Sequence, residues 1–281
     1  VSARLLSAAA LALGIVSMRG VAPGKGLPPV GTLVFGAAVL CPLLLMIGAP
    51  PTGPDEGQYH QRFVEGLLRS GSFPADPQDP LSGLAMGLHA LLALPVSWAG
   101  VDAARPFCFG MGLAGLVAGH RVLRRTIPPT GTWMYLPIAL ASPTLLRTLP
   151  TINSDLTLSL FVGAAALVVL DWRQAPTDPG WRPWVLAVLG GAALSIKYTA
   201  PLFLAPLYGV MAVALLGGGP SRERGRAFAA LVGAALLPAA FAAPWLLRNA
   251  LHLGHPLAPF TGFDPPAGLE SAFRFNFTEN Y

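Results

Sequence analysis

The sequence alternates long apolar stretches with short polar ones, and most of the apolar stretches have the length of helices. A helix that crosses a membrane needs about 20 consecutive apolar residues, and residues 30–49 supply them without a charge. The later apolar stretches cover residues 107–122, 131–150, 156–170, 184–196, 199–216 and 227–247. This pattern predicts an all-α fold, a polytopic transmembrane helical bundle.

The composition agrees with a membrane protein. Hydrophobic residues make up 53% of the chain and charged residues 11%, whereas a soluble domain carries about 25% charged residues. The net charge of +5 comes from small basic groups between apolar stretches, an arrangement that orients a protein in a membrane. We therefore expect one membrane domain over residues 1–281 and no nucleic-acid partner.

The basic groups define an orientation. The positive-inside rule places Arg19, Lys25 and the arginines at 121–125 in the cytoplasm. Under the resulting topology ten Lys/Arg lie inside and seven outside, with Arg4 unassigned, and ten of the 13 acidic residues lie outside. We therefore expect the functional site to lie on the outer face.

This topology divides the membrane domain into named parts. Residues 1–29 are expected to form an N-terminal apolar segment and a cytoplasmic basic linker, 50–102 an outer loop with juxtamembrane helices, and 249–281 a further outer loop. The apolar residues 5–18 are too short for a certain span, and three interpretations stay open: a signal-like segment, a tilted helix, or the end of a helix that begins before residue 1.

The first outer loop is expected to hold two helices that do not cross the membrane. Residues 56–70 place Tyr59, Phe63 and Leu67 on one side, the pattern of an amphipathic helix lying in the interface. Residues 81–99 are apolar, but if they crossed the bilayer the arginines at 121–125 would fall outside. We therefore expect residues 81–99 to lie at the outer interface as a juxtamembrane or re-entrant helix.

Two adjacent carboxylates, Asp55 and Glu56, open this loop. Paired carboxylates at a membrane face can act as general base or metal ligand. The alternative is structural, because Asp55 precedes Gln58 by three residues and that spacing is close to a capping box. The two roles are compatible.

Three further polar residues lie at the outer ends of predicted spans. Asp155 is either a functional carboxylate or a helix N-cap, with Asn153 and Ser154 as competitors for that position. Lys197 and Arg248 are either interfacial anchors or cations for a lipid phosphate.

No cofactor follows directly from the sequence. His60, His252 and His255 lie outside under this topology, but their spacing matches no zinc signature. A divalent cation, Mg²⁺ or Mn²⁺, held by Asp55 and Asp155 with a lipid phosphate stays open.

Taken in order, these features resemble the GT-C type of membrane glycosyltransferases, which use polyprenyl-phosphate sugars and include protein mannosyltransferases and aminoarabinose lipid A transferases. The resemblance starts with a first span followed by Asp55, Glu56 and Tyr59 in a D-E-x-x-Y arrangement. The other matching features are Pro80-Leu81, Asp155, Lys197-Tyr198-Thr199, Pro244-Trp245, Arg248-Asn249 and Gly254-His255-Pro256. The resemblance covers residues 30 to about 260, and since family members are usually longer, the chain resembles a truncated or reduced member.

The resemblance implies inverting transfer of a hexosyl or pentosyl group from a polyprenyl-phosphate sugar to a hydroxyl of a lipid, glycan or protein acceptor. It assigns Asp55 as general base and Glu56 as the second catalytic carboxylate, which orients Asp55 or binds the acceptor. The implied substrate-binding residues are Tyr59, His60, Asp155, Lys197, Tyr198, Arg248 and His255.

Two rival functions use the same topology. A transporter or lipid flippase would favour charges near mid-span or broken helices, and a non-catalytic membrane partner needs no site. The preference for arginine over lysine, with abundant Ala, Gly and Pro, indicates a GC-rich bacterial genome. We expect a multi-pass protein of the bacterial cytoplasmic membrane, surrounded by membrane lipids, with its active site on the extracytoplasmic side.

Overall fold

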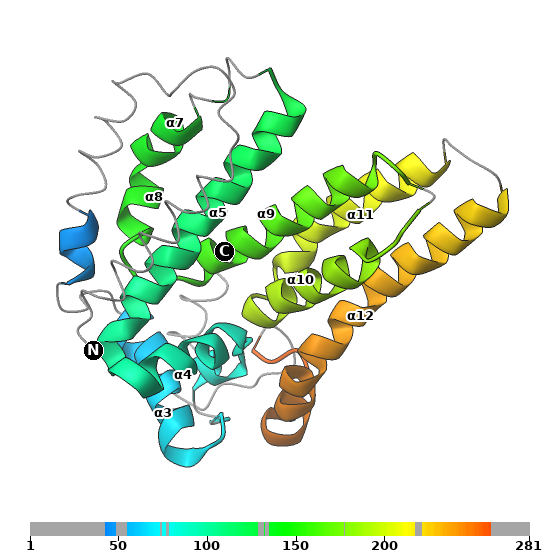
Figure 1. Ribbon diagram of the computed structural model, residues 1–281. Coiled ribbons are helices and arrows are strands. Elements are labelled where there is room, and N and C mark those ends of the chain that lie inside the picture. The colour runs from blue at the N-terminus through cyan, green and yellow to red at the C-terminus, as the bar shows by residue number, and fades with distance from the viewer. Residues whose placement is uncertain are drawn as a thin grey trace.

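The computed structural model describes residues 43–48, 55–73, 75–76, 79–128, 132, 135–176, 178–216 and 221–259. Within these ranges every regular element is a helix (Figure 1), so the all-α prediction is confirmed for this part of the chain. The expectations for residues 5–18, for most of the span at 30–49 and for the tail after residue 259 fall outside it.

The described helices follow one another with short connections. In chain order they are η1 (Asp55–Gln61), α3 (Arg62–Ser70), η2 (Pro80–Gly83), α4 (Gly87–Ala99), η3 (Val101–Ala103), α5 (Ala104–Thr126), α7 (Tyr135–Ala141), α8 (Pro143–Thr148), α9 (Ser154–Trp172), α10 (Arg182–Ile196), α11 (Ala200–Leu216) and α12 (Ser221–Leu253).

Among the described residues, three helices are long and apolar enough to cross a membrane, over Val101–Thr126, Ser154–Trp172 and Arg222–Leu253. The helices α10 and α11 have 15 and 17 residues, and at about 1.5 Å per residue they fall short of a hydrocarbon core of about 30 Å. Large apolar side chains such as Leu202, Val213 and Leu236 lie exposed on the outside of α11 and α12. These features indicate a membrane protein.

The stretch at residues 131–150 differs from the expected span. Its described part forms two short helices, α7 and α8, separated at Ser142. Pro143 is the first residue of α8 and Ser142 caps it, accepting a hydrogen bond from the backbone of Leu145. Proline has no N–H to continue a preceding helix, so the break follows from these two residues.

The helix α4 is short, and the expectation that residues 81–99 do not cross the membrane stays a prediction. It has 13 residues and is not among the long apolar helices. Its first residue, Gly87, lies so close to the end of α10 that a Cβ atom would come within 2.5 Å of the Ser195 carbonyl oxygen. α4 is thereby packed against the end of the helical bundle.

The helix α9 lies inside the bundle and contacts α5, α10 and α11, while α12 packs along α10 (Figure 1). Small residues allow these close approaches: a Cβ atom on Gly115 of α5 would lie 2.5 Å from the Ser159 hydroxyl of α9. The ends of α10 and α12 therefore lie beside the starts of α5 and α9, next to the first outer loop.

Candidate functional site

A buried ion pair fixes the first outer loop to the bundle. Glu56 in η1 is 2% exposed, and its two carboxylate oxygens accept hydrogen bonds from Arg105 of α5, from Nε at 2.8 Å and from Nη2 at 2.5 Å. The backbone N–H of Ile152 donates to the same carboxylate at 2.9 Å. Glu56 therefore joins η1, α5 and the α8–α9 connection. The resemblance implied that Glu56 orients Asp55, but nothing in the sequence pointed to these partners.

Asp55 is held next to this anchor. Its backbone begins η1, and the neighbouring carboxylate of Glu56 is clamped by Arg105. The side chain of Asp55 is outside the described part of the structure, so its assignment as general base, as metal ligand or as cap stays a prediction.

The side chains of two histidines, His60 and His89, meet within this loop. His60 Nδ1 and His89 Nε2 lie 3.1 Å apart, and both side chains are buried. The ring of Tyr59 packs edge-on against His89 with ring centroids 4.9 Å apart. Tyr59 and His60 were predicted as site residues from the sequence, whereas His89 was not. The one feature that could have indicated His89 is the occurrence of a histidine in an otherwise apolar stretch.

Burial keeps both imidazoles neutral. Burial lowers the pKa of His60 from 6.5 to about 4, opposed mainly by the charge of Glu56. Burial also lowers the pKa of His89, as do the nearby charges of His60 and Arg248. A neutral imidazole has one donor and one acceptor nitrogen, and among the described residues nothing bonds to His89 Nδ1. His89 Nδ1 is therefore a buried polar atom without a hydrogen-bond partner among the described residues.

An ion pair joins the start of α9 to the end of α10. Lys197 Nζ lies 2.5 Å from Asp155 Oδ1, and the Asp155 side chain is the more exposed of the two. Asn153 is the N-cap of α9, since its side chain accepts from the backbone of Asp155 at 2.7 Å. Asp155 is therefore not needed as a cap. The charges of Lys197 and Asp155 both reach His60, so this pair borders the histidines.

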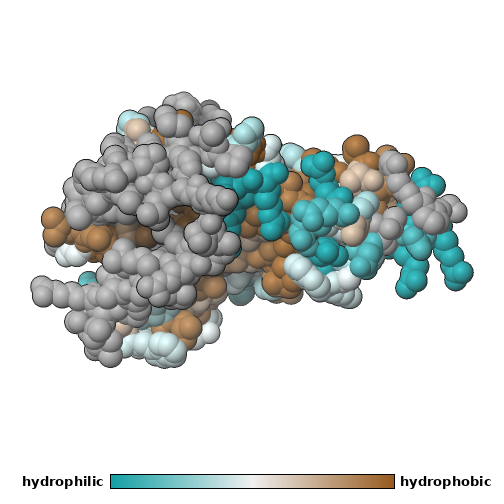
Figure 2. Space-filling view, turned by 45° about the horizontal axis from the view of Figure 1, so that its top comes forward, coloured by the Kyte–Doolittle hydropathy of each residue, from teal (hydrophilic) through white to brown (hydrophobic). Residues whose placement is uncertain are grey.

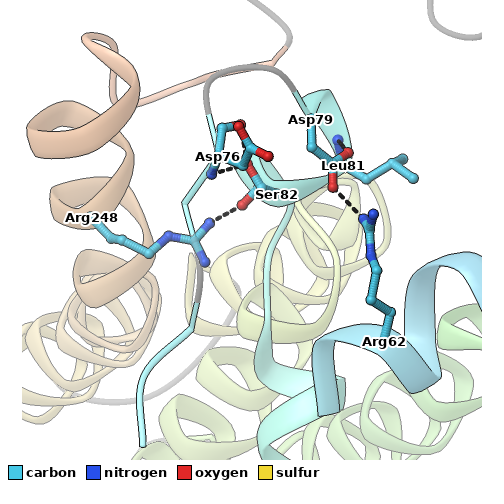
Figure 3. Close-up of polar contacts among 6 residues, drawn as sticks. All are labelled: Arg62, Asp76, Asp79, Leu81, Ser82 and Arg248. Carbon is cyan, nitrogen blue, oxygen red and sulfur yellow. Dashed lines mark hydrogen bonds and ion pairs between the residues drawn. The ribbon is translucent and has the colours of Figure 1, made fainter. Parts of the chain in front are cut away.

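Arg248, near the end of α12, reaches the first outer loop (Figure 3). Its Nη2 donates to the Ser82 carbonyl oxygen and, at 2.9 Å, to the Asn249 side chain. Its Nη1 is buried and has no hydrogen-bond partner among the described residues. Burial raises the pKa of Tyr198, while the charge of Arg248 lowers it, so these two side chains are neighbours.

The loop that receives Arg248 is tied down by its own polar residues. Arg62 pairs with Asp79, whose other oxygen accepts from the Leu81 backbone at 3.0 Å (Figure 3). The Ser82 hydroxyl donates to the Asp76 carbonyl oxygen at 2.9 Å. The Asp79 carboxylate and the Asp76 backbone thus help to fix the conformation of this loop.

The end of α12 and the turn after it also contact the first outer loop. Asn249 is fully buried, and its amide donates to the carbonyl oxygens of Gly83 at 2.7 Å and Ala258 at 3.0 Å. His255 accepts from the Leu257 backbone at 3.2 Å. In the described structure His255 therefore helps to shape this turn.

An apolar pocket of about 270 Å³ opens next to Tyr198. Its walls are side chains of α10, of the α10–α11 connection, of α12 and of the turn after α12: Leu194, Tyr198, Ala239, Ala242, Leu246 and Leu257. Since Tyr198 also neighbours Arg248, this one side chain connects an apolar pocket with the cationic part of the site.

The described residues hold no group of three His, Cys, Asp or Glu side chains arranged to bind a metal ion. One Asp155 oxygen is already engaged by Lys197. A divalent cation shared by Asp55 and Asp155 stays a prediction, because it depends on the Asp55 side chain.

The structure thus gathers most of the predicted site at one end of the helices. His60 and His89 lie at its centre, and the charges of Glu56, Asp155, Lys197 and Arg248 act on one or the other of them. No protein family, curated protein or solved structure matches this chain. The function of the site therefore has to be inferred from the chemistry of its own residues.

Proposed function

We propose that the chain is a membrane glycosyltransferase that transfers a sugar from a polyprenyl-phosphate carrier to an acceptor hydroxyl on the extracytoplasmic face of the bacterial cytoplasmic membrane. The observation that carries this proposal is that Tyr198 lines the apolar pocket, while its hydroxyl and Arg248 both interact with the Asn249 side chain. A lipid phosphate needs an apolar place for its chain and cations for its head, and both occur here within one site.

Arg248 is the stronger of the two phosphate candidates. Its Nη2 is used to hold the loop through Ser82, while its buried Nη1 has no partner among the described residues. An unsatisfied buried donor costs about 1–3 kcal/mol, and a phosphate oxygen would remove that cost. Lys197 shares its charge with Asp155 and would contribute by releasing that carboxylate or by binding alongside it.

In the proposed reaction the acceptor oxygen forms a bond to the anomeric carbon as the bond from that carbon to the carrier phosphate breaks. The acceptor proton passes to the Asp55 carboxylate, and the electron pair of the broken bond stays with the phosphate. A positioned general base contributes about 10² to 10⁴ fold in rate. Arg248 and Lys197 stabilise the negative charge that grows on the leaving phosphate.

The histidine pair gives this site a neutral, poorly hydrated wall. Since His60 and His89 are uncharged near neutral pH, they offer hydrogen bonds to sugar or acceptor hydroxyls and do not compete with the cations for the phosphate. Low hydration strengthens each electrostatic contact made to the leaving group.

The proposal is tested by sugar transfer in proteoliposomes that contain a labelled polyprenyl-phosphate sugar. Arg248→Gln is expected to lower kcat/KM by about 10² to 10³ fold, the usual effect of removing one donor to a developing oxyanion. The matched control is Arg69→Gln, because Arg69 lies exposed on α3 and pairs only with Glu65. Donor binding without transfer by the wild-type chain would favour a lipid flippase or transporter instead.

A further inference from the structure

A second pocket, of about 240 Å³, lies at the opposite end of the bundle from the candidate site. It is lined by Arg125 at the end of α5 and by Leu170, Arg173 and Gln174 at the end of α9. The helix α5 has 23 residues, a length of about 34 Å at 1.5 Å per residue. α5 therefore carries Arg105 of the candidate site near its start and Arg125 of this pocket near its end.

The pocket is cationic and no described carboxylate neutralises it. The described ion pairs involve neither Arg125 nor Arg173. Asp171, which lies between the lining residues in the sequence, is bound by Arg182 with Nε and Oδ2 2.7 Å apart. Arg125 and Arg173 are exposed residues at the ends of two different helices. Arg125 Nη1 donates to the Leu167 carbonyl oxygen at 3.4 Å, and among the described residues no ion pair neutralises either guanidinium group.

The surroundings match a lipid head rather than a plain charged surface. Leu170 gives the pocket an apolar wall, and Gln174 adds an amide that can donate hydrogen bonds. This end of the bundle carries hydrophilic residues, drawn in teal, between hydrophobic ones (Figure 2). Arginines at helix ends also offset the helix dipole, but that role needs neither a pocket nor a second helix.

We propose that this pocket binds the phosphate of an anionic phospholipid head at the membrane face opposite the candidate site. A guanidinium binds phosphate oxygens through two parallel hydrogen bonds, and basic pockets between membrane helices on the cytoplasmic side hold anionic lipid heads in this way. The site is independent of the proposed sugar transfer, since it lies at the other end of α5 and α9.

The test uses the full chain in nanodiscs of phosphatidylcholine with and without phosphatidylglycerol, with lipid retention measured by native mass spectrometry. Arg125→Gln combined with Arg173→Gln is expected to lower the affinity for phosphatidylglycerol about tenfold or more, because charge-assisted hydrogen bonds are lost. The control is Arg222→Gln combined with Arg226→Gln, which removes the same charge from exposed positions on α12. It is expected to change the affinity by less than about twofold.

Two results overturn the proposal. Equal losses in both double variants mean that the lipid is attracted by the whole basic face and not by this pocket. Protection from thermal unfolding by inorganic phosphate in detergent, with the same dependence on Arg125 and Arg173, assigns the pocket to a free phosphate. Unfolding temperatures in pure phosphatidylcholine are expected to match the wild type for both variants, and this comparison separates lost binding from lost folding.

Discussion

Glu56 and Arg105 are 49 residues apart in the sequence and form a two-pronged ion pair in the interior. Their side chains are 2% and 8% exposed, so neither charge is shared with solvent. The pair determines where η1 begins and hence where Asp55 lies relative to the histidines. The position of the proposed general base thus depends on this ion pair.

Breaking this pair is expected to destabilise the protein strongly. Glu56→Gln removes the charge of one partner in a buried ion pair, which costs about 3–5 kcal/mol in comparable cases. The measurement is equilibrium unfolding in detergent micelles, with the surface variant Glu65→Gln as control, because Glu65 pairs with Arg69 at the exposed surface. A loss below about 1 kcal/mol would contradict the anchoring role of Glu56.

The neutral histidine pair makes folding depend on pH. The pKa of His60 is about 4 in the folded protein against 6.5 ordinarily, so the unfolded chain binds the proton more readily between these values. Stability is therefore complete above pH 6.5 and is lost as pH falls toward 4, by about 3 kcal/mol.

Unfolding midpoints measured across this pH range check that expectation. His60→Asn is expected to flatten the dependence, while His252→Asn, at an exposed position near the end of α12, is expected to keep it. An unchanged slope in His60→Asn would show that other groups cause the loss of stability.

The contact of α4 with α10 is expected to tolerate only glycine at residue 87. A Cβ atom there would lie 2.5 Å from the Ser195 carbonyl oxygen, which is a backbone atom. Gly87→Ala is expected to cost about 1–3 kcal/mol, the usual range for overpacking, as measured by thermal unfolding. Gly209→Ala in α11 is the control, since a Cβ atom there meets nothing within 4 Å and alanine favours a helix. Equal unfolding temperatures for the two variants would show that α4 can move away from α10.

The features that depend on local pattern could be predicted from the sequence. The amphipathic period of residues 56–70 appears as η1 and α3, whose buried face includes Phe63 and Val64. The apolar stretch at residues 81–99 contains the helix α4. In both cases the signal lies within a few residues of the element that it describes.

The features that depend on distant contacts could not be predicted. His89 bonds to a residue 29 positions away, and nothing near Glu56 in the sequence points to its partner Arg105. The division of residues 131–150 at Ser142 has a local cause, a serine followed by proline, but the apolar character of the whole stretch concealed it. Hydrophobicity reports where a segment lies and says little about its partners.

The most direct test of the central claim is the rate of sugar transfer by Asp55→Asn in proteoliposomes that contain a labelled polyprenyl-phosphate sugar. Asparagine keeps the shape of the side chain and cannot accept the acceptor proton, so transfer is expected to fall about 10² to 10⁴ fold. Donor binding and unfolding temperature are expected to stay at wild-type values. Asp102→Asn, at an exposed carboxylate in η3, is expected to transfer sugar normally. Undiminished transfer by a correctly inserted Asp55→Asn protein would contradict the account.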